Sequence, residues 1–480
     1  MMFFLRIKLS FLAGALAIAA FTAMFPPPEA LCFTIEDERK VGKEFYEKLE
    51  KNKLIIRDAK INRYIAEIGD KIVRQSAAPL FDFHFNVIDS GAINAFATPG
   101  GYVYLNRGLI TLVENESELA GVLAHEIAHV NARHIAEIIA KSKRVSIATI
   151  AAVLAGAFLG GGGDLSAAAA SFSVAAGTAM NLSYSRQHEE EADRLGMIYL
   201  AGTGYDPKGI LDFLRIMRRY EFYSSSVPSY FLTHPGTDER IRYLDGLLQT
   251  TYTRGGAENM TGRLKRIQVS LLLRSRNPDA VLRQLERELK NNPEDVDVLY
   301  GLAVAQERSG AIAASLENFQ RAMRLSPEDE DIAREFGIAC FKIGKTQESV
   351  QYLRQALSLD EDNRQTILYL SRAYQSLGNY QAAIDLYQRL DEREIEDSDL
   401  LYNMAIAYGK TNRPIESHFY FGRHFKKKNR RDSSLFHFRE ALKFAPEGSD
   451  WSRRIAKEID ELSGRRQESS SRRLPQPFGP

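Results

Sequence analysis

Apolar residues recur at helical spacing in the first region that follows the N-terminus. Between residues 36 and 80 they appear every three or four positions, as at Ile65, Ile68 and Ile72. Such spacing places apolar side chains on one face of an α-helix. The pattern therefore predicts amphipathic helices in this region.

The period then changes to the two-residue alternation of a β-strand. Phe83, Phe85 and Val87 share one parity, and apolar and polar residues alternate again over residues 101–106. A Pro-Gly-Gly sequence between these segments favours a turn. We predict a small sheet with strands in residues 81–89 and 101–106.

A helical pattern returns at residue 116 and predicts one continuous helix to about residue 140. The next segment, residues 145–180, carries almost no charge and is interrupted by the glycine run 160–163. Each half is shorter than the ~20 residues with which a helix spans a bilayer. We expect a buried helical hairpin here, with contact between this segment and a membrane as the alternative.

The second half of the chain repeats itself every 34 residues. Equivalent positions hold glycine, a large apolar residue, alanine or proline: Gly310, Gly344 and Gly378; Leu302, Phe336, Leu370 and Met404; Ala305, Ala339, Ala373 and Ala407; Pro293 and Pro327. This period is typical of tetratricopeptide repeats, whose stacked helical hairpins form a solenoid with a concave surface for another polypeptide. We assign residues 263–450 to this domain, and expect the Ser-, Arg- and Pro-rich tail 465–480 to be disordered.

The N-terminus has the layout of a secretory signal. Arg6 and Lys8 precede the apolar residues 9–25, and three prolines follow. We predict a signal peptide in residues 1–30, with an uncleaved membrane anchor as the alternative. The mature protein is expected to be exported.

Length and composition support two domains and no nucleic-acid partner. The chain has 480 residues, 44% of them hydrophobic, and 63 Lys and Arg against 62 Asp and Glu. A chain of this length exceeds one usual core, and its charge balance does not favour a polyanion. Of the two cysteines, Cys340 falls inside a predicted repeat helix, so we expect no structural disulfide.

The predicted helix 116–140 carries the sequence His125-Glu126-Ile127-Ala128-His129. Residues four apart project from the same face of a helix, so His125 and His129 can share one metal ion. Glu126 projects from the adjacent side and can act as general base toward a water molecule. Two imidazoles with such a carboxylate are typical of a zinc peptidase. We therefore expect one Zn²⁺ per chain.

A catalytic zinc site takes a third protein ligand and leaves one position open. Ala132 and Ile135 occupy the places where a metzincin would continue its motif, and His134 is expected to lie on the helix flank, away from the metal. Glu189 and Asp193, four apart at the start of another predicted helix, suit the task better. Glu189 can be the third ligand while Asp193 orients a ligand imidazole. The alternative is an exposed acidic helix start.

Three further stretches make the assignment specific. Residues 94–101 read Asn-Ala-Phe-Ala-Thr-Pro-Gly-Gly, residues 102–109 continue the strand, and residues 185–193 contain the Ser-Arg…Glu…Ala-Asp element. Together with the His125–His129 motif, they resemble the gluzincin peptidases of the CAAX prenyl protease and heat-shock membrane protease type, over about residues 36–247.

The resemblance implies a zincin-like α+β metallopeptidase domain, mostly helical with a small sheet, in residues 36–252. It implies His125, His129 and Glu189 as zinc ligands, Glu126 as general base and Asp193 as support for a ligand. The repeats point to the exported branch of the family, found in the bacterial periplasm and active in the assembly of outer-membrane β-barrel proteins. Polypeptide substrates and that assembly machinery are the expected partners, with membrane association possible.

Two further site predictions concern substrate and control. The strand that contains Tyr102, Val103 and Tyr104 is expected to border the cleft and to pair with an extended peptide through its edge, the alternative being an ordinary internal strand. His234 lies in a loop with Pro235 and Gly236. It can take the fourth zinc position and keep the enzyme latent, or hydrogen-bond the oxyanion, or merely contact backbone.

These features favour an endopeptidase that acts on misfolded or stalled exported proteins, with the repeats recruiting clients or assembly machinery. A chaperone-like repeat scaffold with latent peptidase activity is the alternative. A prenyl-protein peptidase is disfavoured, because the sequence shows at most one N-terminal membrane span.

Overall fold

The computed structural model describes residues 33–76, 79–141, 146–159, 183–223, 229–275, 277–390 and 397–471. The predicted signal segment 1–30 lies outside these residues. Contacts divide the chain into two compact units that meet at Leu271 and Leu272, and each unit is described by itself.

Among the helices of the described part, none has the length and apolar character needed to cross a membrane.

The first unit begins with the two predicted amphipathic helices, α2 (Ile35–Lys51) and α3 (Ala59–Val73). Thr34 and Asp58 cap their N-termini by accepting hydrogen bonds from backbone N–H groups of the first turn. The apolar face of each helix is buried, and the prediction for this region is confirmed.

The sheet has three strands in the order β1-β3-β2: β1 (His84–Ile88), β2 (Ala95–Thr98) and β3 (Tyr102–Asn106). β1 runs parallel to β3, and β2 runs antiparallel to it. The sequence did not predict β2, because all four of its residues are buried and it shows no alternation of apolar and polar positions. β3 is the central strand, so the prediction that it offers an edge to substrate is wrong.

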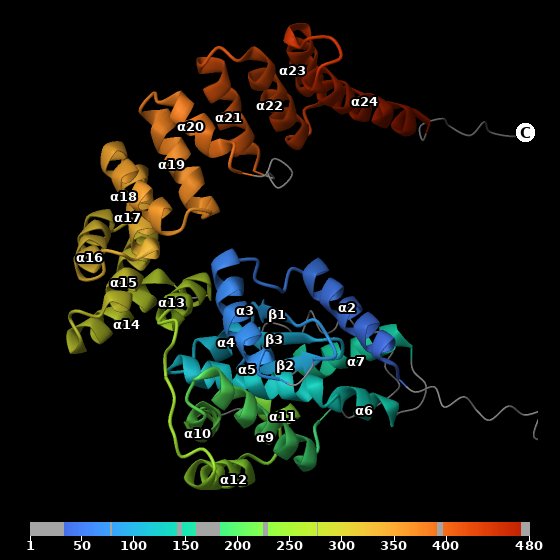
Figure 1. The fold of residues 1–480 in the computed structure, drawn as a ribbon, viewed down its shortest axis with the longest axis vertical. Coiled ribbons are helices and arrows are strands. Elements are labelled where there is room, and N and C mark those ends of the chain that lie inside the picture. Colours follow the sequence, from blue (N-terminus) through green and yellow to red (C-terminus); the bar gives the residue numbers. More distant parts are fainter. Residues whose placement is uncertain are drawn as a thin grey trace, which may run out of the picture. The chain divides into compact units, whose positions relative to one another are not determined.

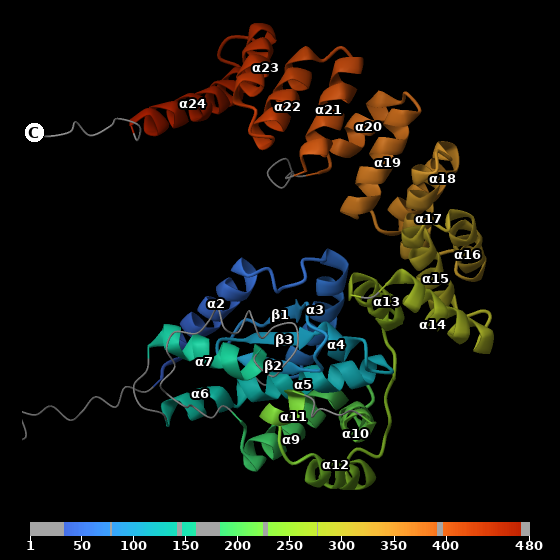
Figure 2. The ribbon, with the colours of Figure 1, turned by 180° about the vertical axis from the view of Figure 1, so that it is seen from behind.

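The two faces of the sheet pack against different helices (Figures 1 and 2). Ala95, Ala97, Val103 and Leu105 join the core that α3 and α5 (Glu116–Asn131) share. The opposite face, with Phe96 and Tyr104, packs against α2 and α7 (Ile147–Leu159). The sheet is thus buried on both sides, with α5 fixed against one of them. The second half of the predicted 145–180 hairpin lies outside the described residues.

The predicted continuous helix 116–140 is two helices, which corrects the expectation from the sequence. α5 ends at Asn131, and α6 (His134–Ala140) begins after a turn in which Arg133 adopts a left-handed conformation with φ 56°. Arg133 is held in this turn by the buried Glu38 and by the carbonyl of Phe33. These contacts come from distant parts of the chain, so local helical periodicity does not reveal them.

Five more helices of the first unit complete the surroundings of α5 and of the sheet, either directly or by packing against the helices that touch them. They are α4 (Arg107–Ile110), α9 (Arg186–Thr203), α10 (Lys208–Tyr223), α11 (Ser229–Thr233) and α12 (Thr237–Thr250). α9 and α10 make extensive contact with α5. The helix that carries the His125–His129 motif is therefore enclosed by helices and by the sheet.

Helix α13 (Leu264–Ser275) belongs mainly to the first unit, although the sequence assigned residues from 263 onward to the repeats. Leu264, Ile267 and Leu271 are buried in the core that contains α5. Gln268 donates hydrogen bonds from its Nε2 to the carbonyls of Ile110, the last residue of α4, and of Val113. The boundary between the units thus falls inside α13.

The segment before α13 is held by one buried carboxylate at the start of α5. Glu116 accepts hydrogen bonds from the backbone N–H groups of Met260, Thr261 and Arg263, and from the hydroxyls of Thr261 and Tyr64. Burying a charge is favourable only when its acceptor positions are filled in this way. Residues 260–263 are therefore part of the first unit.

The second unit consists of helical hairpins, as the 34-residue period predicted. Its helices are α14 (Pro278–Asn291), α15 (Val296–Ser309), α16 (Ile312–Leu325), α17 (Glu330–Lys342), α18 (Thr346–Leu359), α19 (Arg364–Ser376), α20 (Tyr380–Tyr387), α21 (Ser398–Lys410), α22 (Pro414–Lys427), α23 (Arg431–Phe444) and α24 (Asp450–Ser471). Gly310, Gly344 and Gly378 adopt positive φ after the first helix of a pair. α24 continues past residue 465, where the sequence predicted disorder to begin.

The repeat period falls from 34 to 17 residues near the end of the repeat domain. Asn412 follows α21 and Asn429 follows α22, each with φ 57°. Ser417 donates to the carbonyl of Ala405, and Ser434, 17 residues later, donates equivalently to the carbonyl of Gly422. α22 is therefore the second helix of one hairpin and the first helix of the next, which explains why the sequence period weakens here.

Candidate metal centre

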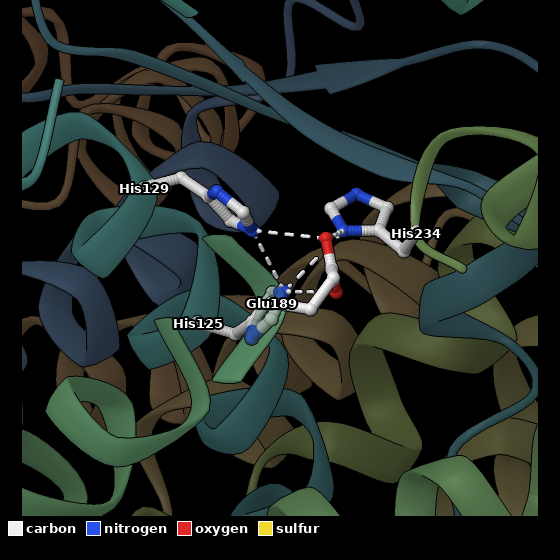
Figure 3. Close-up of side chains that lie close together, drawn as sticks. All are labelled: His125, His129, Glu189 and His234. Carbon is white, nitrogen blue, oxygen red and sulfur yellow. Dashed lines mark hydrogen bonds and ion pairs between the residues drawn. The ribbon is translucent and has the colours of Figure 1, made fainter. Parts of the chain in front are cut away.

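Helix α5 places the two motif histidines on adjacent turns. His125 and His129 are 1% and 2% exposed, and their Nε2 atoms lie 3.0 Å apart (Figure 3). Tyr184, which precedes α9, stacks on the ring of His129 with the ring centroids 3.8 Å apart. Packing and helix geometry thus fix both imidazoles toward one point.

Helix α9 brings Glu189 to the same point from the other side. Ser185 caps this helix and accepts from the N–H of His188, so the helix begins just before Glu189. The Glu189 carboxylate lies 3.4 Å from Nε2 of His125 and 3.5 Å from Nε2 of His129. The structure brings together the three residues that the sequence proposed as ligands.

His234 completes a group of four candidate ligands. It follows α11 and is fully buried, with its Nδ1 3.0 Å from Oε1 of Glu189 and 3.3 Å from Nε2 of His125. Its ring stacks on Tyr230, with the ring centroids 4.4 Å apart. The side chain therefore points into the centre, and does not serve only as a contact for backbone.

The geometry and chemistry of these side chains fit a zinc ion. One ligand atom of each of His125, His129, Glu189 and His234 lies within 4.8 Å of the others. Zinc bonds of about 2.0–2.1 Å in a tetrahedron place ligand atoms roughly 3.3–3.4 Å apart, which is close to the contacts observed. Burial raises the pKa of Glu189, but the neighbouring His234 and Arg240 outweigh this and hold it well below the usual value. The carboxylate is thus an anionic donor.

Asp193 lies one turn after Glu189 and supports His125 from behind. Its Oδ1 is 2.9 Å from Nδ1 of His125, the nitrogen that faces away from the ligand group. Arg240, on α12, donates to both carboxylate oxygens of Asp193 at 2.7 and 2.8 Å and lies 2.6 Å from Glu189. Sequence reasoning missed Arg240, because only the fold brings α12 against α9.

Glu126 lies beside the ligands with no hydrogen-bond partner for either carboxylate oxygen within the described part of the chain. It is fully buried, and burial raises its pKa although His234 and His125 oppose the shift. Nε2 of His234, 3.6 Å away, also lacks a hydrogen-bond partner among these residues. A buried polar group without a partner is rare in a stable core. These polar atoms are therefore available to bind a reactive water or a substrate group.

The sequence predicted His134 on the flank of a continuous helix, away from the metal, whereas the structure places it at the start of α6 and beside a candidate ligand. Because α5 ends at Asn131, the chain turns, and His134 is buried with its Nδ1 2.8 Å from Nδ1 of His129. It is not one of the four candidate ligands. It contacts a ligand instead.

Among the described residues, β2 is the strand near the centre that leaves one edge without a strand partner, and this is called the free edge of β2 below. Within the described residues β2 pairs only with β3, whereas β3 is paired on both sides. A small recess, with room for about one water molecule, lies between the end of β2 and His129 and is lined among others by Ala97, Thr98 and Tyr184. The predicted edge strand, which contains Tyr102, Val103 and Tyr104, is thus the central strand of the sheet.

Known proteins match each part of the chain. Residues 59–248 match Peptidase family M48, and residues 268–330 and 341–407 match tetratricopeptide repeat families. The putative beta-barrel assembly-enhancing protease of Vibrio cholerae is 37% identical over 209 residues, 43% of this chain and 43% of its own length. The beta-barrel assembly-enhancing protease of Escherichia coli is 34% identical over the same shares.

A mitochondrial peptidase is similar to a shorter part of the chain. The mitochondrial metalloendopeptidase OMA1 of Schizosaccharomyces pombe is 32% identical over 182 residues, 38% of this chain and 51% of that protein. The match to the two bacterial relatives named above spans 43% of the length of each of them. These matches agree with the predicted order of a peptidase domain followed by tetratricopeptide repeats.

Proposed function

We propose, from the premise that this chain carries a peptidase domain of family M48 followed by tetratricopeptide repeats, that it is a zinc-dependent endopeptidase of the bacterial cell envelope. The observation that carries the proposal is the convergence of His125, His129 and Glu189 beside Glu126, whose carboxylate has no hydrogen-bond partner among the described residues. One zinc ion per chain would be held by these three ligands. When bound, it supplies Lewis-acid polarisation of a peptide carbonyl and activation of water.

The side chains around the centre divide the remaining work. Glu126 takes the proton of the attacking water and delivers it to the leaving amine, for which a raised pKa is suitable. Asp193 accepts from Nδ1–H of His125 and so directs Nε2 toward the metal. Arg240 keeps both Asp193 and Glu189 ionised in their buried positions.

An extended substrate is proposed to add to the free edge of β2. Asn106 donates its backbone N–H to the carbonyl of Asn94, which marks a hydrogen-bonded pair of the antiparallel ladder. By alternation, Ala95 and Ala97 direct their N–H and C=O groups away from β3. Main-chain bonds to this edge bind a peptide without strict sequence choice.

Metal analysis combined with casein cleavage tests this function. We expect about one zinc per chain in the wild type, lost in His125→Ala and Glu189→Ala but retained in Glu126→Gln. Glu126→Gln should nevertheless lose on the order of 10²-fold or more in turnover, because the general base is outside the metal shell. Full zinc occupancy in Glu189→Ala would contradict the assignment of the third ligand.

His234 is proposed to control or assist the reaction. Its Nδ1 faces Glu189 and His125, which suits a fourth ligand that holds the enzyme latent. Its Nε2, which lies near Glu126 and has no hydrogen-bond partner among the described residues, suits a donor to the oxyanion. Latency predicts that His234→Ala increases self-cleavage or casein cleavage. Oxyanion support predicts a loss of ~10²-fold or more in turnover with zinc retained. A wild-type rate would exclude both roles.

Exported and outer-membrane proteins are the proposed clients, with periplasmic quality control as the setting. The support is the name of the bacterial relatives and the presence of a repeat domain of the kind that binds other polypeptides. The second candidate is a chaperone-like scaffold with latent peptidase activity, which the position of His234 among the ligands favours. Casein cleavage by the wild-type protein separates the two.

A further inference from the structure

His134 links a candidate metal ligand to a carboxylate on another helix. Its Nδ1 lies 2.8 Å from Nδ1 of His129, and its Nε2 lies 3.3 Å from Oε2 of Glu191 on α9. His134 is 1% exposed, whereas the side chain of Glu191 is about half exposed. The three side chains form a chain from the metal centre to the surface.

The contacts of the two ring nitrogens of His129 determine which nitrogen carries the proton in His129 and in His134. Nε2 of this residue faces the ligand group, 3.0 Å from His125 and 3.5 Å from Glu189. A nitrogen that binds a metal carries no proton, so the proton of neutral His129 is on Nδ1. His129 therefore donates to Nδ1 of His134. The proton of His134 is then on Nε2, where it donates to Glu191.

Surrounding contacts hold the His134 ring in this orientation. The ring stacks on His188 with the ring centroids 4.4 Å apart and an interplanar angle of 18°. His188 is itself fixed, because its Nδ1 accepts from the backbone N–H of Ser185 in the cap of α9. On the other side, the left-handed turn at Arg133, tied to Glu38, sets where α6 begins. The imidazole is thus placed by two helices and one turn.

The two motif histidines consequently have different supports. His125 donates to Asp193, a buried carboxylate paired with Arg240. His129 donates to a neutral imidazole. We propose that His134 is a positioning residue for the metal centre, which together with Glu191 fixes the tautomer and orientation of His129. This proposal depends on the metal centre described above, but not on peptidase activity.

Zinc affinity of the full-length protein, measured by competition with a chromophoric chelator, tests the proposal. His134→Phe keeps a ring against His188 but removes the acceptor, and should weaken zinc binding by about 10- to 100-fold. His134→Asn offers an amide oxygen in place of Nδ1 and should recover most of that loss. Glu191→Gln should lower zinc affinity severalfold. Glu190→Gln, a change at the neighbouring exposed carboxylate, should bind zinc as the wild type does.

Thermal unfolding of the metal-free variants provides the structural control. Because the link acts on the ligand, His134→Phe and His134→Asn should unfold at similar temperatures without metal yet differ in zinc affinity. Equal zinc affinity in His134→Phe and wild type, or equal losses in the Phe and Asn variants, would overturn the proposal. If His134→Phe does not fold, equal zinc affinity of Glu191→Gln and Glu190→Gln would overturn the proposal. A wild-type protein that binds no zinc would instead refute the metal centre itself.

Discussion

The candidate ligand Glu189, the neighbouring Asp193 and the guanidinium of Arg240 lie together, away from water. Glu189 and Asp193 are 1% and 0% exposed, and Arg240 is 5% exposed. Asp193 receives two hydrogen bonds from Arg240, and Arg240 Nη1 lies close to Glu189. Because desolvated charges are costly without partners, this arrangement holds the ligand side of α9 in place.

Arg240→Met should therefore destabilise the protein through the carboxylates that it leaves unpaired. We expect the free energy of unfolding of the metal-free protein to fall by about 3–5 kcal/mol, as for other buried pairs that lose one partner. Urea unfolding measures this change. Arg242→Met, two residues along the same helix and exposed, is the matched control. Equal stability of the two variants would show that Arg240 contributes little.

At the residue scale, spacing alone predicted His125, Glu126 and His129, because residues four apart must share a helix face. Glu189 came from the same argument applied to α9. The residues that hold these groups were not predictable in this way. Arg240 reaches Asp193 from a different helix, and the contact of His134 with His129 depends on the turn at Arg133.

At the scale of elements, periodicity predicted α2, α3 and β1 because each buries only part of its surface. β3 was predicted from the alternation of Tyr with Val and Leu, although four of its five residues are buried. Periodicity failed for β2, which is buried throughout. It also failed at the end of α5, where residues compatible with a helix are turned by contacts with Phe33 and Glu38. Elements set by tertiary contacts leave no period in the sequence.

The free edge of β2 gives a test of substrate binding. Ala97→Pro removes an N–H that points away from β3, so the ladder with β3 can persist, as for proline on other edge strands. A peptide would lose one main-chain bond of about 1 kcal/mol, or roughly a fivefold rise in KM. Cleavage of a quenched fluorescent peptide measures this change.

Ala97→Val is the matched control, because it adds comparable volume in the same buried position but keeps the N–H. Thermal unfolding of both variants separates loss of binding from loss of fold. A KM for Ala97→Pro that equals that of Ala97→Val would argue against peptide addition at β2.

At the scale of the whole molecule, the position of α13 decides where the peptidase can be separated from the repeats. A chain that ends after Tyr252 lacks the apolar side chains of Leu264, Ile267 and Leu271 that complete its core. It also lacks the backbone groups that satisfy Glu116. We expect this fragment to be poorly folded.

A fragment that ends at Ser275 keeps these contacts and should cleave casein like the full-length protein. Circular dichroism and casein cleavage of the two fragments measure the difference. Equal stability of both would show that α13 is dispensable for the first unit.

The repeats also expose aromatic side chains that suit the proposed recruitment of clients. Tyr402, Phe436 and Phe444 are 45%, 56% and 52% exposed. Ring contacts connect Tyr402 with Phe436, because Tyr402 contacts Phe421, Phe421 contacts His437, and His437 contacts Phe436. Phe444 joins the same group through His418, which contacts His437. Exposed apolar surface of this kind marks an interaction site when its members are contiguous.

The double variant Tyr402→Ser/Phe436→Ser should weaken binding of an unfolded outer-membrane β-barrel protein by about tenfold or more, the effect of losing aromatic anchors at an interface. Fluorescence anisotropy with a labelled, urea-diluted barrel protein measures binding. Casein cleavage should not change, since the centre is on another unit. Leu325→Ser, also exposed in the repeats, serves as control; an equal effect there would remove the special role of the aromatic side chains.

Helix α22 belongs to two hairpins at once, and this affects how the chain can gain or lose length. Because the turns at Asn412 and Asn429 are equivalent, deleting residues 413–429 would join α21 directly to α23 through the same turn and the same serine contact. Earlier in the repeats, the smallest deletion that restores such a junction is a full pair of helices. Genetic insertion or loss can thus proceed here by single helices, which makes this end of the domain the place where related chains are expected to differ most in helix number.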